Sequence, residues 1–95
     1  MAIKFIVAVI TAEPAHADAV EQALQAAVPA VRTEPGCIQY DLHRDQSEPG
    51  RFVMIEQWSD EQALKAHGEA AAFRKLSSVL DGRASLEIID LAKIA

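Results

Sequence analysis

The chain has 95 residues, 51% of them hydrophobic, and a formal net charge of −5 at pH 7. This length fits one domain over residues 1–95, and the apolar fraction is sufficient for a single core. The negative charge and the lack of a Lys/Arg cluster argue against partners such as nucleic acid or an anionic membrane surface.

The single cysteine, Cys37, excludes an intramolecular disulfide and a zinc site built from cysteines. The apolar run near the N-terminus ends by Ala12, which is too short to span a bilayer. The features of a secretory signal peptide are not convincing either. We therefore expect a soluble, cytoplasmic protein.

The first predicted element is a strand over residues 3–11, which is rich in β-branched side chains and apolar on both faces. Pro14 suits the first turn of a helix, and apolar residues then repeat at helical spacing over residues 17–31. Pro29 predicts a kink or a tightened turn near residues 25–28. The segment Glu34-Pro35-Gly36 predicts the end of this helix.

Residues 37–44 and 51–58 are predicted to form a β-hairpin, because a Ser-Glu-Pro-Gly turn signal joins two alternating segments. Ile38, Tyr40 and Leu42 are expected on one face of its first strand.

A second helical segment follows the hairpin. Ser59 and Gln62 fit a capping box at its start. Gly68 is predicted to interrupt the helix, and Asp81-Gly82 to end it. A last strand is predicted over residues 84–91.

The resulting order, β-α-β-β-α-β, is that of an α+β ferredoxin-like fold with a four-stranded antiparallel sheet. Both helices should cover one face of this sheet. Because the first strand is apolar on both faces, the other face needs a cover, and a second copy of the sheet is the simplest one. We therefore expect a homodimer in which two sheets pack face to face.

His67 is the first candidate for a catalytic residue. It shares a predicted helix face with Ala63 and Leu64, and this face points at the sheet. A neutral imidazole there could accept a proton from a bound phenol or hydroquinone, because histidine titrates near working pH. The alternative is a core histidine satisfied by a backbone carbonyl or by Glu56.

Three aromatic residues are candidates for substrate binding. Trp58, the only tryptophan, could form a flat wall for an aromatic ligand or act as a packing anchor. Tyr40 could line a pocket or pack, and its hydroxyl needs a partner if it is buried. Phe73 fits the core and could also narrow a pocket.

Glu56 is the last candidate for substrate binding, since it is a carboxylate in the middle of a strand. Such groups are rarely buried without a partner. The sequence allows three partners for it, namely His67, Arg44 and Arg51.

No metal or cofactor is expected. His16 and His43 share no ligand spacing with each other or with His67, and there is no Gly-rich phosphate loop or recognisable nucleophile motif.

The stretches EPGCIQYDLHRD and RFVMIEQWSDEQALKAHGEAAAF resemble the antibiotic biosynthesis monooxygenase family, including the small bacterial quinol monooxygenases. The residues that carry the resemblance are Glu34, Gly36, Tyr40, Glu56, Trp58, His67 and Phe73. The resemblance implies a dimeric α+β barrel. It also implies oxidation of a quinol or a related hydroxylated aromatic by molecular oxygen, with no metal or flavin.

The chain departs from the family pattern at two places. Many members carry a second histidine before the Phe, where this chain has Ala72. Haem-degrading relatives use a histidine and an asparagine at places that correspond approximately to Ser77 and Val7, which disfavours a haem role. The competing hypothesis is a non-catalytic dimer that binds a small apolar metabolite or serves as a stress-associated module.

Overall fold

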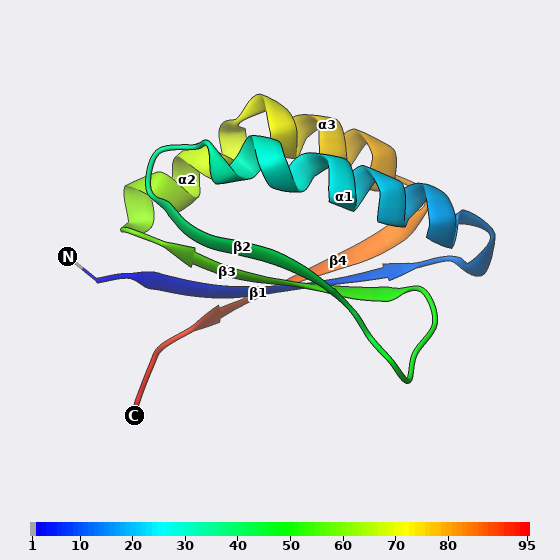
Figure 1. Ribbon diagram of the computed structural model, residues 1–95, viewed down its shortest axis with the longest axis horizontal. Helices are drawn as coiled ribbons and strands as arrows, with labels where there is room; N and C mark the ends of the chain where they lie inside the picture. Colours follow the sequence, from blue (N-terminus) through cyan, green and yellow to red (C-terminus); the bar gives the residue numbers. More distant parts are fainter. Residues whose placement is uncertain (1) are drawn as a thin grey trace.

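The computed structural model describes residues 2–95. The strands are β1 (Lys4–Ala12), β2 (Cys37–Arg44), β3 (Arg51–Trp58) and β4 (Ala84–Leu91). The helices are α1 (Ala17–Arg32), α2 (Glu61–Glu69) and α3 (Ala71–Leu80), and a short 3-10 turn, η1 (Pro14–His16), precedes α1. The strands form one antiparallel sheet in the order β2-β3-β1-β4. Figure 1 shows all three helices on one face of this sheet, which confirms the predicted ferredoxin-like α+β fold.

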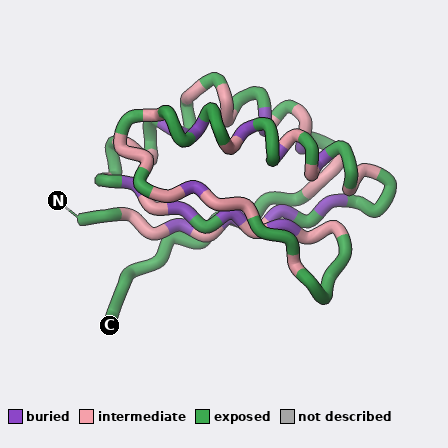
Figure 2. Tube along the Cα trace, viewed as in Figure 1, coloured by how far each residue is buried: buried purple, intermediate pink, exposed green. Residues whose placement is uncertain are grey.

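The core lies between the helices and the covered face of the sheet (Figure 2). Alternation along β1 and β3 turns a row of apolar side chains toward the helices. These side chains are buried and belong to Ile6, Ala8, Ile10, Ala12, Phe52 and Met54. The buried face of α1 packs on them through Val20, Leu24, Ala27 and Val31. The apolar faces of the strands and of α1 therefore pack together in one hydrophobic core.

Helix α1 continues through Pro29 and ends at Arg32. The tightened turn predicted before the proline is found after it, where Thr33 donates to the carbonyl of Ala30 and Glu34 to that of Val31. Both hydrogen bonds join residue i to residue i−3, the 3-10 pattern that often forms the last turn of an α-helix. Gly36 then turns the chain into β2 at φ 82°.

The predicted start of α2 is wrong by one residue. Asp60, not Ser59, is the N-cap, and its carboxylate accepts from the backbone N–H of Ala63 at 2.8 Å. The backbone N–H of Ser59 instead donates to the carbonyl of Gly36 at 2.8 Å. This long-range bond keeps Ser59 outside the helix, so the next polar residue caps it.

The helical segment breaks at Ala70, not at Gly68, which lies inside α2. Ala70 adopts extended backbone angles (φ −75°, ψ 157°) and serves both as the C-cap of α2 and as the N-cap of α3. The segment is therefore two helices, and the change of direction lets both of them contribute to the same cavity.

Strand β2 contains a bulge that the sequence did not predict. Cys37 pairs with Trp58 and Gln39 pairs with Gln57, which leaves Ile38 as the extra residue. Ile38 is 52% exposed, so it does not share the buried face with Tyr40. The alternation is restored after the bulge.

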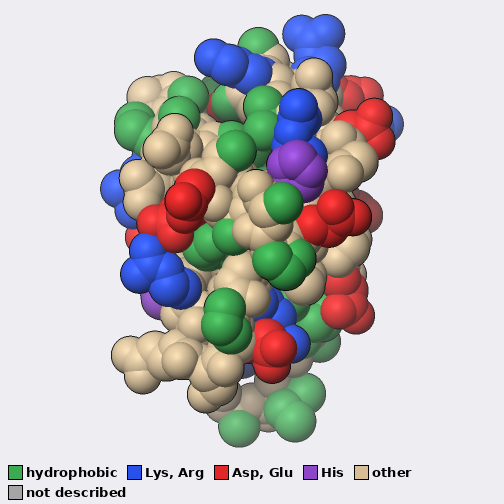
Figure 3. Space-filling model, turned by 90° about the vertical axis from the view of Figure 1, so that its right-hand side faces the viewer, with side chains coloured by type: hydrophobic (Ala, Val, Ile, Leu, Met, Phe, Trp, Pro, Cys, Tyr) green, Lys and Arg blue, Asp and Glu red, His purple; other side chains and the backbone are tan. Residues whose placement is uncertain are grey.

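The face of the sheet that the helices leave uncovered is also apolar. Phe5, Val7, Val9 and Val53 are half-buried there, and Ile55, Ile89 and Leu91 of β3 and β4 are exposed. Among residues 2–95, none of the helices has the length and hydropathy to cross a membrane. At the end of the molecule shown in Figure 3, Lys/Arg and Asp/Glu side chains are interspersed.

Candidate functional site

A cavity of about 110 Å³ lies between the covered face of the sheet and helices α2 and α3. Its wall is apolar apart from three side chains, those of Tyr40, Glu56 and His67. The apolar residues that line it are Ile6, Ala8, Ile10, Leu24, Met54, Leu64, Phe73, Leu76, Leu80, Leu86 and Ile88. An apolar cavity with a few convergent polar groups is the usual form of a small-molecule site.

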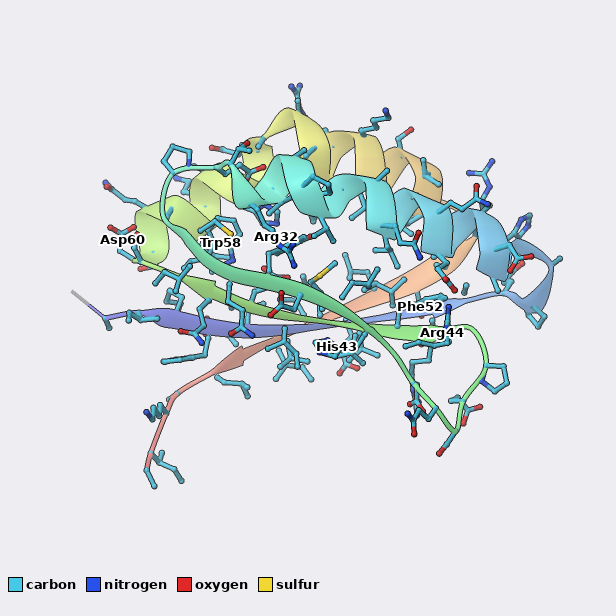
Figure 4. The ribbon with its side chains drawn as sticks, viewed as in Figure 1. Arg32, His43, Arg44, Phe52, Trp58 and Asp60 are labelled. Atoms are coloured by element: carbon cyan, nitrogen blue, oxygen red, sulfur yellow. The ribbon has the colours of Figure 1, made fainter. Side chains whose placement is uncertain are left out.

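His67 is the buried residue of α2, and three aromatic rings surround it. The Trp58 ring stacks on the imidazole, with the centroids 4.5 Å apart and the planes inclined by 27°. Phe73 and Tyr40 meet the imidazole edge-on, at centroid distances of 5.3 and 5.5 Å. Figure 4 shows Trp58 projecting from the end of β3 into the layer below α2. The ring of His67 is therefore fixed in orientation by its aromatic neighbours.

Glu34 is the hydrogen-bond partner of His67. Its Oε1 lies 2.9 Å from Nδ1, and both side chains are largely buried. A carboxylate can only accept, so Nδ1 carries the proton in this pair. When the ring is neutral, Nε2 is then its acceptor nitrogen, and the hydrogen bond to Glu34 does not engage it. The arrangement prepares His67 to accept a proton at Nε2.

Glu56, which the sequence offered as a partner for His67, Arg44 or Arg51, has a different partner. Its Oε1 accepts from Nε1 of Trp58 at 2.9 Å, and the carboxyl is buried. Arg44 and Arg51 pair with Glu21 and Asp45 instead. The buried Glu56 and the partly buried Glu34 thus have separate roles, in that Glu34 holds the imidazole and Glu56 holds the indole.

Burial is the main cause of the shifted pKa values of Glu56 and Tyr40, two of the polar side chains that line the cavity. It raises the pKa of Glu56 above the ordinary carboxyl value, although the hydrogen bond from Trp58, and His67 whenever its ring is protonated, act in the opposite direction. Burial, and then the charges of Glu56 and Glu34, also raise the pKa of Tyr40 far above its ordinary value. Tyr40 therefore stays a neutral phenol, able to donate a hydrogen bond toward the cavity.

The loop that carries Glu34 is attached tightly to α2. A Cβ added at Gly36 would lie 2.4 Å from Cβ of Ala63 and 2.7 Å from Oγ of Ser59. Only glycine fits this approach, and its left-handed φ also favours glycine. Arg32 attaches the C-terminal end of α1 to β2. Its guanidinium donates hydrogen bonds to the backbone oxygen of Tyr40 at 3.1 Å and to the carboxylate of Asp41 at 2.8 Å.

The structure brings the predicted residues together. Tyr40, Glu56, His67 and Phe73 line the cavity, and Trp58 stacks behind His67. From the sequence, Glu34 was named as part of a helix end and of the family resemblance, but not as a site residue or as the partner of His67. The available signal was the spacing of Glu34 and Gly36, which belongs to the family pattern.

Ala72 lies outside the cavity, since it lines a groove between α1 and α3. A histidine at this position would therefore point away from the ring of His67 in this chain. Among residues 2–95, no group of three or more His, Cys, Asp or Glu side chains is placed to hold a metal ion.

A ferredoxin-like domain with an aromatic-lined cavity between sheet and helices belongs to the class of small α+β proteins that bind or transform a small ligand. The sequence model of antibiotic biosynthesis monooxygenases matches residues 4–78, and the chain belongs to this family. This confirms the resemblance seen in the sequence.

Known proteins similar to this chain agree with the assignment. A protein of Bacillus subtilis (strain 168) with the name "Putative monooxygenase YcnE" is 46% identical over 50 residues, which is 53% of this chain and 53% of that protein. The match thus spans about half the length of this relative. The crystal structure of PA3566 from Pseudomonas aeruginosa superposes with a TM-score of 0.93 at 38% identity and covers 100% of this chain and 97% of that one.

A second solved structure, described as an antibiotic biosynthesis monooxygenase, gives a TM-score of 0.90 at 29% identity over 97% of this chain and 99% of that chain. Together these findings support a monooxygenase-type or small-ligand-binding protein of this family.

Proposed function

We propose that this protein is a cofactor-independent monooxygenase that oxidises a quinol or a related hydroxylated aromatic with molecular oxygen. The observation that carries the proposal is the pair formed by Glu34 and His67, in which the carboxylate engages Nδ1 of a histidine that lines an apolar cavity and leaves Nε2 as the second ring nitrogen. A base buried among aromatic rings suits the removal of a proton from a phenolic hydroxyl.

The dimensions of the site support a ligand of one or two aromatic rings. An apolar cavity of about 150 Å³ is known to hold benzene, so the 110 Å³ here is close to the size of one ring. Leu86 and Ile88 of β4 line the cavity and are 40% and 53% exposed, so the cavity opens along this strand. The remainder of a larger substrate can extend through that opening.

The proposed reaction starts when Nε2 of His67 accepts the phenolic proton. The electron-rich phenolate then transfers one electron to oxygen, and the resulting radical and superoxide combine at a ring carbon as a peroxide. Loss of water leaves one oxygen atom on the ring. Hydroquinone and O₂ would give a hydroxyquinone and water, and the ring supplies all four electrons.

The residues of the site have three tasks in this reaction. His67 moves the proton, with its ring held by the stacked Trp58, Phe73 orients the bound ring, and the apolar wall excludes water from the anionic intermediate. The hydroxyl of Tyr40 and the carboxyl of Glu56 are available to the second oxygen of the substrate.

The test is oxygen uptake in a closed cell with a panel of substituted hydroquinones. We expect His67→Ala to lower the rate by about 10²–10⁴-fold, the usual contribution of general acid–base catalysis. His43→Ala is the matched control, because His43 is exposed on β2 and lies away from the helices in Figure 4. Retained circular dichroism shows that the variants fold.

The alternative is a non-catalytic protein that binds a small apolar metabolite. It is supported if phenols quench Trp58 fluorescence with micromolar affinity while no hydroquinone consumes oxygen above the background rate. Haem degradation has less support. Val7 lies on the uncovered face of the sheet, and the residues of β1 that line the cavity, Ile6, Ala8 and Ile10, are apolar.

We also propose that the protein is a homodimer formed by the uncovered faces of two sheets. Val7 is paired with Ile55 and Ile89, and together they form the centre of an apolar surface on β1, β3 and β4. Ile55→Lys should convert a dimer to a monomer in light scattering at micromolar concentration, whereas Ile38→Lys, on the bulge, should not. A monomeric mass for the unmodified protein would contradict this proposal.

A further inference from the structure

His67 separates two spaces in the molecule. One is the apolar cavity, and the other is a surface cleft of about 410 Å³. His67 lines both spaces, whereas Glu34 lines the cleft and not the cavity. The imidazole is therefore the link between an apolar cavity and a cleft at the surface.

A hydrogen-bonded path crosses this boundary. It begins at Nε2 of His67, passes through the ring to Nδ1, and reaches Oε1 of Glu34 over 2.9 Å. The side chain of Glu34 is 15% exposed, against 6% for that of His67. Water in the cleft can therefore reach the carboxylate at the end of the path more readily than the imidazole.

The carboxylate is held in place by its backbone. The N–H of Glu34 donates to the carbonyl of Val31 at 2.9 Å, and the carbonyl of Glu34 accepts from Cys37 at 3.2 Å. Two residues further on, the carbonyl of Gly36 accepts a hydrogen bond from the backbone N–H of Ser59, just before α2. The loop thus keeps Glu34 in contact with His67.

Two carboxylates and a phenol are the titratable groups near the ring of His67. Glu34 approaches from the loop after α1, Glu56 from β3 and Tyr40 from β2, and Cys37 of β2 lies near both carboxylates. The two carboxylates attract the imidazolium that forms when Nε2 takes up a proton. Neither the cavity nor the cleft is lined by a lysine or an arginine.

We propose that Glu34 is a positioning residue for His67 and also the exit by which the substrate proton reaches solvent. The inference rests on the proposed function, because the substrate hydroxyl is the proton source. The O–H bond of the phenol breaks and an Nε2–H bond forms. The Nδ1–H bond breaks, its proton passes to Glu34, and water in the cleft takes it from there. No electron moves in this step.

The same path returns a proton when the peroxide intermediate releases water. Protons then enter and leave through the cleft and need no water in the apolar cavity, even when the substrate fills the opening along β4. This separates the route of protons from the route of the substrate along β4.

The first test needs no turnover. Glu34→Gln keeps an oxygen that accepts from Nδ1–H but cannot take up the proton. We expect exchange of the His67 Nδ1–H with water, followed by NMR on the full chain, to slow at least tenfold in this variant. Glu69→Gln, which neutralises an exposed carboxylate of α2, should stay within twofold of the unmodified protein. Unchanged or faster exchange in Glu34→Gln would show that Glu34 only holds the ring, which overturns the inference.

The second test uses oxygen uptake with the hydroquinone that reacts fastest. Glu34→Gln should lower kcat about a hundredfold with KM within threefold, and added formate should restore the rate in proportion to its concentration. Formate should restore nothing in His67→Ala. A kcat that Glu34→Gln leaves unchanged overturns the inference. If no hydroquinone consumes oxygen, the proposed function fails, and the exchange measurement still decides the proton path.

Discussion

Replacing Gly36 with alanine should destabilise the protein more than any other glycine-to-alanine change in the chain. The alanine must adopt a φ of 82°, a left-handed conformation that costs roughly 1–2 kcal/mol. Its methyl group would also lie 2.4 Å from Cβ of Ala63. Ser59 can rotate away from the new group, but a helical Cβ cannot, so the loop and α2 must separate.

The overlap adds about 1–3 kcal/mol, as is usual for overpacked sites. The expected loss in the free energy of unfolding is therefore about 2–5 kcal/mol for Gly36→Ala. Gly82→Ala is the matched control. Gly82 has a similar φ of 76°, but its added Cβ would have no neighbour within 4 Å. This control should lose only the roughly 1–2 kcal/mol of the left-handed conformation.

The assay is urea unfolding at one fixed protein concentration, followed through the fluorescence of Trp58, the only tryptophan. A second substitution isolates the overlap. Ala63→Gly removes the opposing methyl group, so the double variant with Gly36→Ala should recover about 1–3 kcal/mol relative to the sum of the single losses. Equal losses for Gly36→Ala and Gly82→Ala, with no coupling to Ala63, would refute the reasoning.

Three further outcomes follow from the site. The folded-state pKa of Glu56 is raised above 4.5 by burial, so the folded protein holds this proton more tightly than the unfolded chain and loses stability as pH rises through the folded pKa. The Glu56→Gln variant has no carboxyl to titrate, so its free energy of unfolding relative to the unmodified protein should increase with pH above about 4.5. If the free energies of the two proteins change in parallel from about pH 4 to 8, the prediction is contradicted. Trp58→Phe removes the N–H donor of the buried carboxylate and should cost about 1–3 kcal/mol at neutral pH, measured by circular dichroism, and less in acid. Gly68→Ala places a methyl group in open space within α2 and should stabilise the protein by about 0.5–1 kcal/mol, and a loss of stability would be the opposite result.

The periodicities of the sequence were sufficient for most of the fold. The helical spacing in α1 predicted which of its side chains face the core, because burial on one face imposes this period directly. Strand β1 was predicted as apolar on both faces, and the structure decided which face the helices cover. Gly36, Gly50 and Gly82 marked three of the turns, and all three adopt positive φ. The cavity residues His67, Tyr40, Glu56 and Phe73 could also be proposed, since each is a polar or aromatic group on an inward face.

The N-cap of α2 was predicted wrongly because two neighbouring residues are equally suitable locally and a long-range contact determines which of them is used. Ser59 and Asp60 are both good helix caps, and the bond from Ser59 to Gly36 assigned the role to Asp60. The break at Ala70 has no local signal, because alanine is the strongest helix former.

By itself, the sequence determined the order of strands and helices, the buried faces and the set of groups available for chemistry. The tertiary structure alone decided that Glu34 holds His67 and that Glu56 holds Trp58. The reason is physical. Glu34 and His67 are separated by 33 positions in the chain. Their hydrogen bond forms because Gly36 has no side chain, which lets the loop approach α2 more closely than any other residue would allow.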